Sequence, residues 1–429
     1  MTATRGAELR RTFAAMLSIL IFLAVFLALL SLIEWGAWRS FRRMANSTNN
    51  SKLLRRMWWT VTSVLGLWLI VYTFKWNVWR EDCAGCFMAF HGVLLTFLVP
   101  KLFMAVTELI ASLQHGVRAL MKPKADRAKM GRRTFITTVG QGVAGAMFAS
   151  FAYGMLRGRY NFTTRRVEVP IEGLPPGLDG FKIVQISDMH LGSFLGYNEH
   201  VEAGLQLVRD LDPDLLCLTG DLVNVHADEA DPWIESFKTL SGRHGKFAVL
   251  GNHDYGDYGE FTDEEKVNIG RDVRQKYTSM GFDLLLNRHV EIERGGEKFT
   301  LVGVENWGRH FRRAGDLDAA LEGADPSRPT VLMSHDPTHW EEKVMGEKAP
   351  VDLTLSGHTH GMQMGLEIAS LGIKFSPSRL TYRYWGGLYR VGKQQLYVNR
   401  GFGYLGVPGR IGMPPEVTEL ILRTAPRTA

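Results

Sequence analysis

Four long uncharged apolar segments near the amino terminus constrain the fold of this chain more than any other feature. They are residues 12–33, 57–74, 83–100 and 134–156, and the third is interrupted only by His91. A helix of about 20 apolar residues crosses the hydrocarbon core of a bilayer, whereas a secretory signal peptide is one short run near the amino terminus. The sequence therefore predicts four transmembrane helices and a multi-pass location in the cell membrane. Buried helices of a soluble protein are the alternative.

The sequence changes character after the fourth run, where short apolar stretches alternate with helical stretches and polar turns. This change predicts a membrane domain at 1–156 and a second domain at 157–429. The formal net charge of +6 is modest, and many basic residues flank the apolar runs. Such placement suits membrane edges rather than a basic face within a folded domain, so we expect no nucleic-acid partner.

The lysines and arginines also predict the orientation in the membrane. The loops after the first and third runs hold more of them than the segments on the other side, so these loops should be cytoplasmic. The second domain then lies outside the cytoplasm. Arg132 and Arg133, in the stretch GRRTFIT before the fourth run, resemble a twin-arginine export signal or form a basic membrane flank. Both interpretations place them in the cytoplasm.

Three cysteines give limited information. Cys217 lies in an apolar, strand-like stretch and should pack in a core. Cys83 and Cys86 form a C-x-x-C pair without the second pair that a zinc site would need. They are either packing residues or a small disulfide, the latter if their loop faces an oxidising space.

Five strand-like stretches of the second domain each end in residues that can bind metal. FKIVQIS precedes Asp188 and His190, DLLCLTG precedes Asp221, KFAVLG precedes Asn252 and His253, TVLMS precedes His335, and DLTLSG precedes His358 and His360. Residues 197–211 and 263–280 read as amphipathic helices between them. Alternating strands and helices predict an α/β domain with a mixed or parallel sheet, in which ligands gather at the carboxyl ends of the strands.

The side chains at these strand ends have the chemistry of a site for two divalent metal ions. Carboxylate, amide and imidazole donors together suit Mn, Fe, Zn, Ni or Co better than calcium. Residues i and i+2 of an extended segment face the same way, so Asp188 with His190, and His358 with His360, can each serve one cluster.

The ordered motifs SDMH, GDLVN, GNHD, SHDP and SGHTH resemble those of the calcineurin-like metallophosphoesterase superfamily. The tail at 399–420 is similar to a branch of bacterial membrane-associated phosphodiesterases related to UDP-2,3-diacylglucosamine hydrolase. The resemblance implies a β-sandwich flanked by helices. It also implies one metal site of Asp188, His190, Asp221 and His360, and another of Asp221, Asn252, His335 and His358, with Asp221 bridging. Asn224 departs from the pattern, since many relatives have aspartate there.

The same resemblance implies roles for residues that do not hold metal. His253 would face the substrate and stabilise or protonate the leaving oxygen, and Asp254 would orient its imidazole. Hydroxide shared by the two metals would attack phosphorus. We expect Arg400, in the late motif, to contact phosphate. The basic and aromatic segment 378–390 would suit a membrane interface.

Together these features predict a membrane-anchored dinuclear-metal phosphoesterase that hydrolyses phosphodiester or pyrophosphate bonds of a lipid-linked or sugar-nucleotide substrate. Its partners would be the lipid bilayer and a phosphate-containing lipid or nucleotide. One alternative is a broad-specificity phosphomonoesterase or nucleotide phosphodiesterase. A second is a non-catalytic membrane binding or signalling protein. A transporter is disfavoured, because the four runs hold almost no ionisable group besides His91.

Overall fold

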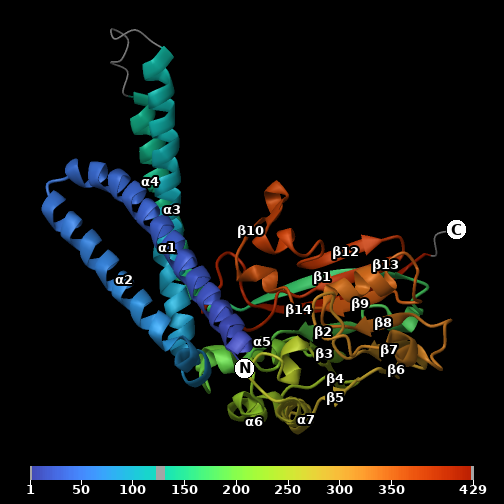
Figure 1. Ribbon diagram of the computed structural model, residues 1–429. Coiled ribbons are helices and arrows are strands. Elements are labelled where there is room, and N and C mark those ends of the chain that lie inside the picture. Colours follow the sequence, from blue (N-terminus) through green and yellow to red (C-terminus); the bar gives the residue numbers. More distant parts are fainter. Residues whose placement is uncertain (1, 122–130, 427–429) are drawn as a thin grey trace. The chain divides into compact units, whose positions relative to one another are not determined.

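The computed structural model describes residues 2–121 and 131–426 of the chain. The chain divides into two compact units (Figure 1). The membrane unit consists of Met1–Lys75 and Val93–Ala152, and the second unit consists of Trp76–Gly92 and Tyr153–Ala429. The second unit therefore takes in residues 76–92 and 153–156, which the sequence-based division assigned to the membrane domain.

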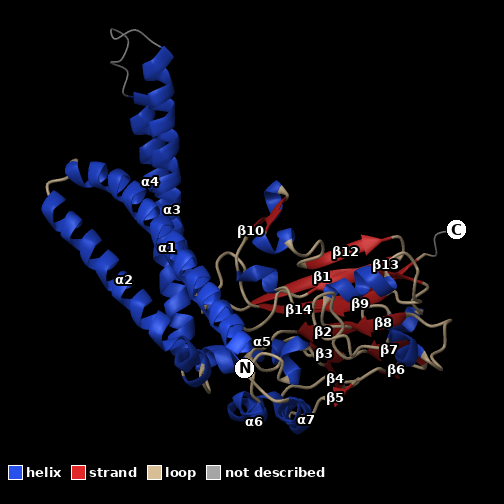
Figure 2. Cartoon of the chain, viewed as in Figure 1, coloured by secondary structure: helices blue, strands red, loops and turns tan. Residues whose placement is uncertain are grey.

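Four long helices make up the first part of the chain (Figure 2), namely α1 (Thr2–Asn46), α2 (Ser51–Asp82), α3 (Ala84–Met121) and α4 (Gly131–Leu156). Each contains a stretch long and apolar enough to cross a membrane, at Ala24–Asn46, Ser51–Trp76, Ala84–Gln114 and Thr134–Leu156. The prediction of four membrane helices is confirmed, although the first span lies nearer the carboxyl end of its helix than 12–33. The chain is a multi-pass membrane protein.

The membrane unit contains charged groups that the sequence analysis did not count. Lys101 Nζ lies 2.7 Å from Glu34 Oε2, and the side chains of Trp58 and Thr62 donate hydrogen bonds to Glu34 Oε1. The expectation of almost no ionisable group besides His91 was therefore wrong. The apolar runs ended at Glu34 and Lys101, but the helices continue through both residues. Charged side chains within membrane-spanning helices are stabilised by pairing with each other.

Cys83 and Cys86 form a disulfide at the start of α3, one of the two alternatives that the sequence left open. Cys217 is fully buried, as expected for a packing residue.

The second unit is built around two six-stranded sheets, which confirms the predicted β-sandwich. The first has the order β1 (Thr163–Glu172), β14 (Glu416–Ala425), β2 (Lys182–Ile186), β3 (Leu215–Thr219), β4 (Lys246–Val249), β5 (Asp283–Leu284). The second has the order β12 (Gly387–Val391), β13 (Gln394–Val398), β9 (Leu353–Ser356), β8 (Thr330–Met333), β7 (Glu297–Gly303), β6 (Arg288–Arg294). Strands β2, β3 and β4 are parallel, as are β7, β8 and β9.

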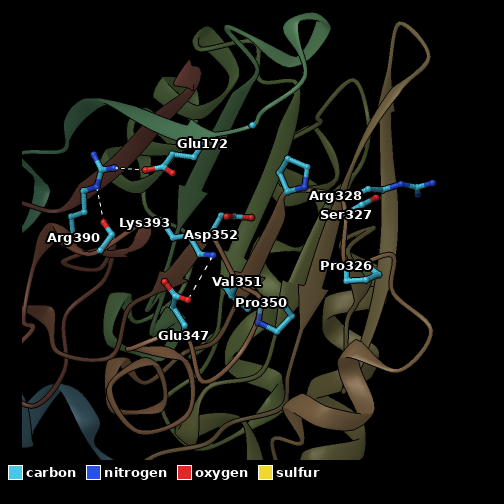
Figure 3. A pocket seen from close by; sticks show the side chains of 13 residues that line it. Glu172, Pro326, Ser327, Arg328, Glu347, Pro350, Val351, Asp352, Arg390 and Lys393 are labelled. Carbon is cyan, nitrogen blue, oxygen red and sulfur yellow. Dashed lines mark hydrogen bonds and ion pairs between the residues drawn. The ribbon is translucent and has the colours of Figure 1, made fainter. Parts of the chain in front are cut away.

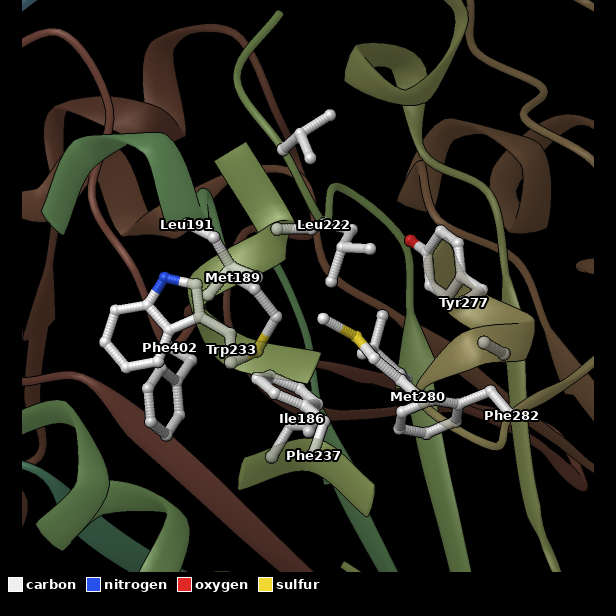
Figure 4. Packing of buried hydrophobic residues seen from close by; sticks show 14 of the residues in the cluster. Ile186, Met189, Leu191, Leu222, Trp233, Phe237, Tyr277, Met280, Phe282 and Phe402 are labelled. Atoms are coloured by element: carbon white, nitrogen blue, oxygen red, sulfur yellow. The ribbon is translucent and has the colours of Figure 1, made fainter. Parts of the chain in front are cut away.

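Alternating side chains of the first sheet serve two cores, because successive residues of a strand point to opposite faces. Ile183 and Cys217 belong to the cluster between the two sheets. Val184 belongs to the cluster beneath the helices, where Trp233 and Tyr277 are fully buried (Figure 4). The covering helices are α5 (Glu199–Asp210), α6 (Ile234–Lys238) and α7 (Asp263–Ser279). Full burial of one large apolar side chain stabilises the fold by about 1.5–3 kcal/mol, so this packing holds the strand ends firmly.

Candidate metal centre

The carboxyl ends of five strands bring the predicted metal ligands to one place. Asp188 and His190 follow β2, Asp221 follows β3, Asn252 and His253 follow β4, His335 follows β8, and His358 and His360 follow β9. All of these side chains are buried or nearly so. The parallel strands end at the same edge of each sheet, which is why distant parts of the sequence meet there.

The backbone at the candidate ligands is in an unusual conformation. Asp188, His190, Asp221, His358 and His360 have φ between 44° and 71°, the left-handed region that costs energy for residues other than glycine. Such residues cluster at functional sites, where the surrounding structure holds them. These residues form sharp turns that place side chains immediately after the ends of β2, β3 and β9.

One cluster contains Asp188, His190 and His360, whose donor atoms all lie within 4.8 Å of one another. His360 Nε2 is 3.2 Å from Asp188 Oδ1 and 3.1 Å from His190 Nε2. The other ring nitrogen of His190 lies 3.0 Å from Asn224 Oδ1. The departure at Asn224 therefore places an amide oxygen against a candidate ligand, where it fixes the ring orientation.

The second cluster contains Asp221, His335 and His358, again with donor atoms within 4.8 Å. Asp221 Oδ2 lies 3.1 Å from His335 Nε2 and 3.6 Å from His190 Nε2 of the first cluster. Asp221 Oδ1 accepts a hydrogen bond from the backbone N–H of His253. The carboxylate of Asp221 thus has one oxygen held by the backbone and one oxygen facing both clusters, as a bridging ligand requires.

The surroundings of the two ring nitrogens of His335 suit the binding of a cation. Its Nδ1 lies 2.7 Å from the carbonyl oxygen of Thr219, which can only accept, so Nδ1 carries the proton. In a neutral ring Nε2 then offers a lone pair, yet it faces two further acceptors, Asp221 Oδ2 and Asn252 Oδ1, each at 3.1 Å. A proton on Nε2 or a metal ion among the three atoms resolves this conflict. Together with the mix of carboxylate, imidazole and amide donors, this suits divalent Mn, Fe, Zn, Ni or Co.

The pKa values of these groups also indicate that the site favours a positive charge. Burial alone would lower the pKa of His335, but the carboxylates of Asp221 and Asp188 raise it to about 10. Burial alone would raise the pKa of both carboxylates, yet the neighbouring imidazoles bring each below its usual range. Both aspartates are therefore charged, which is the form that binds metal.

His253 lies beside the two clusters, and its surroundings fix its ring. Its Nδ1 lies 2.7 Å from the backbone oxygen of Asn224, so Nδ1 donates and Nε2 is the nitrogen available to a substrate. Tyr258 stacks on the imidazole, with ring centroids 3.8 Å apart and an interplanar angle of 8°. The Tyr258 hydroxyl also accepts from Asn252 Nδ2 at 2.5 Å, which turns Asn252 Oδ1 toward His335 and His358. Sequence analysis missed Tyr258, which lies four residues after the GNHD motif.

The expected contact of Asp254 with His253 is wrong. The Asp254 carboxylate instead accepts hydrogen bonds from the backbone N–H groups of Asp221, Leu222 and Gly251, and from the hydroxyl of Tyr277. Burial, then the charge of Asp221, raises the pKa of Asp254 to about 7. Asp254 therefore positions the turns that carry Asp221 and Asn252, and the Asn224 carbonyl orients His253.

The expected phosphate contact of Arg400 also fails. Its side chain is only 3% exposed, and its guanidinium pairs with Glu416 at 2.7 Å and Glu367 at 2.5 Å. Two carboxylates already neutralise the cation inside the domain, so it is a structural ion pair. The buried arginine near the ligands is Arg410, which donates to the backbone oxygens of Arg400, Gly401 and Gly403 and lies 3.3 Å from His360 Nδ1. Sequence analysis missed this residue, although it lies in the late motif.

A cavity of about 780 Å³ lies elsewhere on the second unit (Figure 3). Arg328 and Asp352, which line it, lie just before β8 and β9, at the opposite strand ends from His335 and His358. Its charged side chains pair with their own neighbours, such as Arg390 with Glu172 at 3.4 Å. This cavity is therefore separate from the candidate metal centre.

Two family models match the chain. One, described as "Calcineurin-like phosphoesterase", matches residues 181–362, which contain all of the candidate metal ligands. The other, described as "Probable Calcineurin-like phosphoesterase, transmembrane domain", matches residues 16–159. The chain belongs to the calcineurin-like phosphoesterases. These matches confirm the family and the fold class predicted from the sequence.

The chain is also similar to several curated proteins. A "Transmembrane protein with metallophosphoesterase domain" from Danio rerio is 30% identical over 284 residues, covering 64% of this chain and 60% of the relative. The "Uncharacterized metallophosphoesterase YkuE" of Bacillus subtilis is 29% identical, covering 69% of this chain and 99% of the relative. The "UDP-2,3-diacylglucosamine pyrophosphatase LpxG" of Chlamydia muridarum is 28% identical, covering 53% and 79%. The chain spans about three fifths of the length of the transmembrane relative.

Proposed function

We propose that the protein hydrolyses phosphodiester or pyrophosphate bonds of a lipid-linked substrate at the membrane surface, with two divalent metal ions. The observation that carries this proposal is the pair of ligand clusters that share the Asp221 carboxylate. Asp188, His190, Asp221 and His360 would hold one ion, and Asp221, Asn252, His335 and His358 the other. When bound, two such ions activate water and stabilise the charge that develops on phosphoryl oxygens.

The residues of the chain supply the remaining chemistry. His253 presents Nε2 beside the clusters, and when its ring carries a second proton there it can pass that proton to the leaving oxygen and return to the neutral form protonated at Nδ1. Tyr258 and the Asn224 carbonyl hold the imidazole in place, so little of its orientation has to be fixed when the substrate arrives. Asp254 secures the turns of Asp221 and Asn252 through their backbone.

Two observations support a lipid-linked substrate, and two more support a site outside the cytoplasm. Four membrane helices hold the catalytic unit at a bilayer, and one relative is named for a pyrophosphatase of a diacylated sugar nucleotide. The Cys83–Cys86 disulfide belongs to the same compact unit as the metal centre, and disulfides persist in oxidising compartments. The bias of basic residues toward the loops after the first and third runs favours the same side.

Hydrolysis by the full-length protein tests the proposal. We would compare Mn²⁺-dependent turnover of bis(p-nitrophenyl) phosphate and p-nitrophenyl phosphate in nanodiscs, with Asp221→Asn, His253→Ala and the exposed control His310→Ala. Asp221→Asn should lose activity together with bound metal. His253→Ala should keep its metal and lose about 10²–10⁴ in rate. The control should match the wild type.

The ratio of the two substrates decides between diesterase and monoesterase. Faster turnover of the monoester would favour the broad phosphomonoesterase. A folded protein that binds Mn²⁺ but turns over no phosphodiester, pyrophosphate or monoester, lipid-linked substrates included, would favour a non-catalytic binding protein.

A further inference from the structure

A small hairpin beside the metal centre exposes its apolar face, whereas a soluble domain would bury that face. Strands β10 (Leu366–Ile368) and β11 (Ile373–Phe375) form a two-stranded sheet separate from the sandwich (Figure 1). Directly opposed residues of a hairpin share a face, and so do residues two apart in a strand. One face therefore holds Leu366 with Phe375 and Ile368 with Ile373, and the other holds Glu367 with Lys374.

The charged face is the one that the domain holds. Glu367 accepts from Arg400 at 2.5 Å and from Arg165 at 2.7 Å. Lys374 Nζ donates to the backbone oxygen of Gly386 and lies over the rings of aromatic neighbours. Because these contacts fix the charged face against the second unit, the apolar face is turned away from it.

Several large apolar side chains of the hairpin and of the residues just beyond it are exposed. Leu366 is 50% exposed, Phe375 54% and Leu371, in the connection between the strands, 67%, while Leu380 just beyond the hairpin is 91% exposed. Exposed apolar patches of this kind mark sites of protein or membrane interaction. Arg379 and Arg383 are also exposed and add positive charge next to the patch.

The base of the hairpin is joined to the end of the last membrane span. Gly365 N donates to Ile411 O, and Ile411 N donates to Gln363 O, at 2.9 and 2.8 Å. The neighbouring Arg410 N donates to Gly154 O at 3.2 Å, and the Ile411 side chain leaves no room for a Cβ on Gly154. Gly154 lies in the last turn of the span that ends at Leu156. The base of the hairpin thus pairs with the segment at Arg410 and Ile411, and this segment contacts the end of the last membrane helix.

Both ends of the hairpin are also tied to the metal centre. The hairpin follows His360 by a few residues, and on its return Ser376 donates from its hydroxyl to Gly361 O at 2.6 Å. Further on, the Tyr382 hydroxyl lies 2.8 Å from His358 Nε2. The depth of the hairpin in a membrane would therefore set the height of the metal centre above it.

We propose that residues 366–380 insert their apolar side chains into the interfacial layer of the bilayer that the four helices cross, so that the metal centre opens at the lipid surface. The partner is the bilayer itself, with anionic headgroups facing Arg379 and Arg383. This goes beyond the sequence-based expectation of a membrane edge at 378–390, because it names the hairpin and its outward face. Insertion rests on contacts of the fold alone, and only the entry of lipid substrate rests on the proposed function.

Depth-dependent quenching in nanodiscs that hold one full-length chain each tests the insertion. Leu371→Cys would carry an environment-sensitive NBD label, and Val267→Cys on α7, 71% exposed, is the matched control. Cys83 and Cys86 are bonded to each other and Cys217 is buried, so the introduced thiol is the accessible one. We expect doxyl-labelled lipid to quench the label at 371 and not the label at 267. Equal quenching at both positions would overturn the proposal, and with one chain per disc a second copy cannot cover the hairpin.

A functional comparison tests the consequence for the substrate. In the same discs, the double variant Leu371→Ser, Phe375→Ser should turn over a lipid phosphodiester about 10-fold to 100-fold more slowly, because the site is misplaced relative to its substrate. Its turnover of soluble bis(p-nitrophenyl) phosphate should be unchanged. An equal loss on both substrates would show a structural effect and contradict the proposed entry from the bilayer. Quenching requires no turnover, so failure of the proposed function and failure of the insertion give different results.

Discussion

Replacing Tyr258 by phenylalanine would separate its two contacts. The substitution removes the hydroxyl that accepts from Asn252 Nδ2 at 2.5 Å and keeps the ring that stacks on His253. Without that acceptor, the Asn252 amide is no longer held with its oxygen toward His335 and His358. We therefore expect weaker metal binding and an unchanged rate at saturating metal.

The size of the effect follows from the exposure of the residue. A hydrogen bond contributes a net ~1 kcal/mol, and Tyr258 is 39% exposed, so water can replace part of the loss. A cost of about 0.7–1.4 kcal/mol corresponds to roughly threefold to tenfold weaker metal binding. Calorimetric titration of chelator-stripped protein with Mn²⁺, together with the metal dependence of hydrolysis, would measure it.

A matched variant, Tyr258→Leu, also removes the stacked ring. It should weaken metal binding by a similar factor and, in addition, lower the rate at saturating metal, because the imidazole of His253 loses its support. If Tyr258→Phe left the metal affinity unchanged, or if both variants lowered the saturated rate equally, this division of roles would be refuted.

Three further predictions concern stability. Asp254→Asn places an amide N–H against backbone donors and should lower the melting temperature of the detergent-solubilised protein, at a cost of about 1–3 kcal/mol; an unchanged melting temperature would contradict its positioning role. Arg400→Met removes the buried cation between Glu416 and Glu367 and leaves both to the more exposed Arg165, so it should cost up to about 3–5 kcal/mol, with KM for a soluble diester unchanged. A raised KM with normal stability would instead support the original expectation that Arg400 contacts phosphate. Removing metal with a chelator should lower the melting temperature, since a ligand at 100 times its Kd adds about 2.7 kcal/mol, and Asp221→Asn should show no such shift.

Much of the metal centre could be predicted from the sequence because each ligand directly follows its own strand. The stretch KFAVL is followed directly by Gly251 and Asn252, so strand and ligand can be read together. The parallel arrangement of β2, β3 and β4 then brings the strand ends to one edge. The four membrane helices were equally accessible, since their signal is a continuous apolar run that needs no partner.

The partners of Asp254 and Arg400 could not be predicted, because they depend on residues that are distant in the sequence. Tyr277 lies 23 residues after Asp254, and Glu367 lies 33 residues before Arg400. A carboxylate next to a histidine, or an arginine in a late motif, does not reveal which groups the fold will place against it.

The hairpin at 366–375 also separates what the sequence determines from what the tertiary structure determines. Its alternating apolar and charged residues are determined by the sequence, and they would fit an ordinary strand with a buried apolar face. Only the tertiary structure decides that Glu367 and Lys374 face the domain and the apolar side chains face outward. The physical reason is that alternation defines two faces of a strand, whereas the ion pair of Arg400 and Arg165 with Glu367 determines which face is held inside.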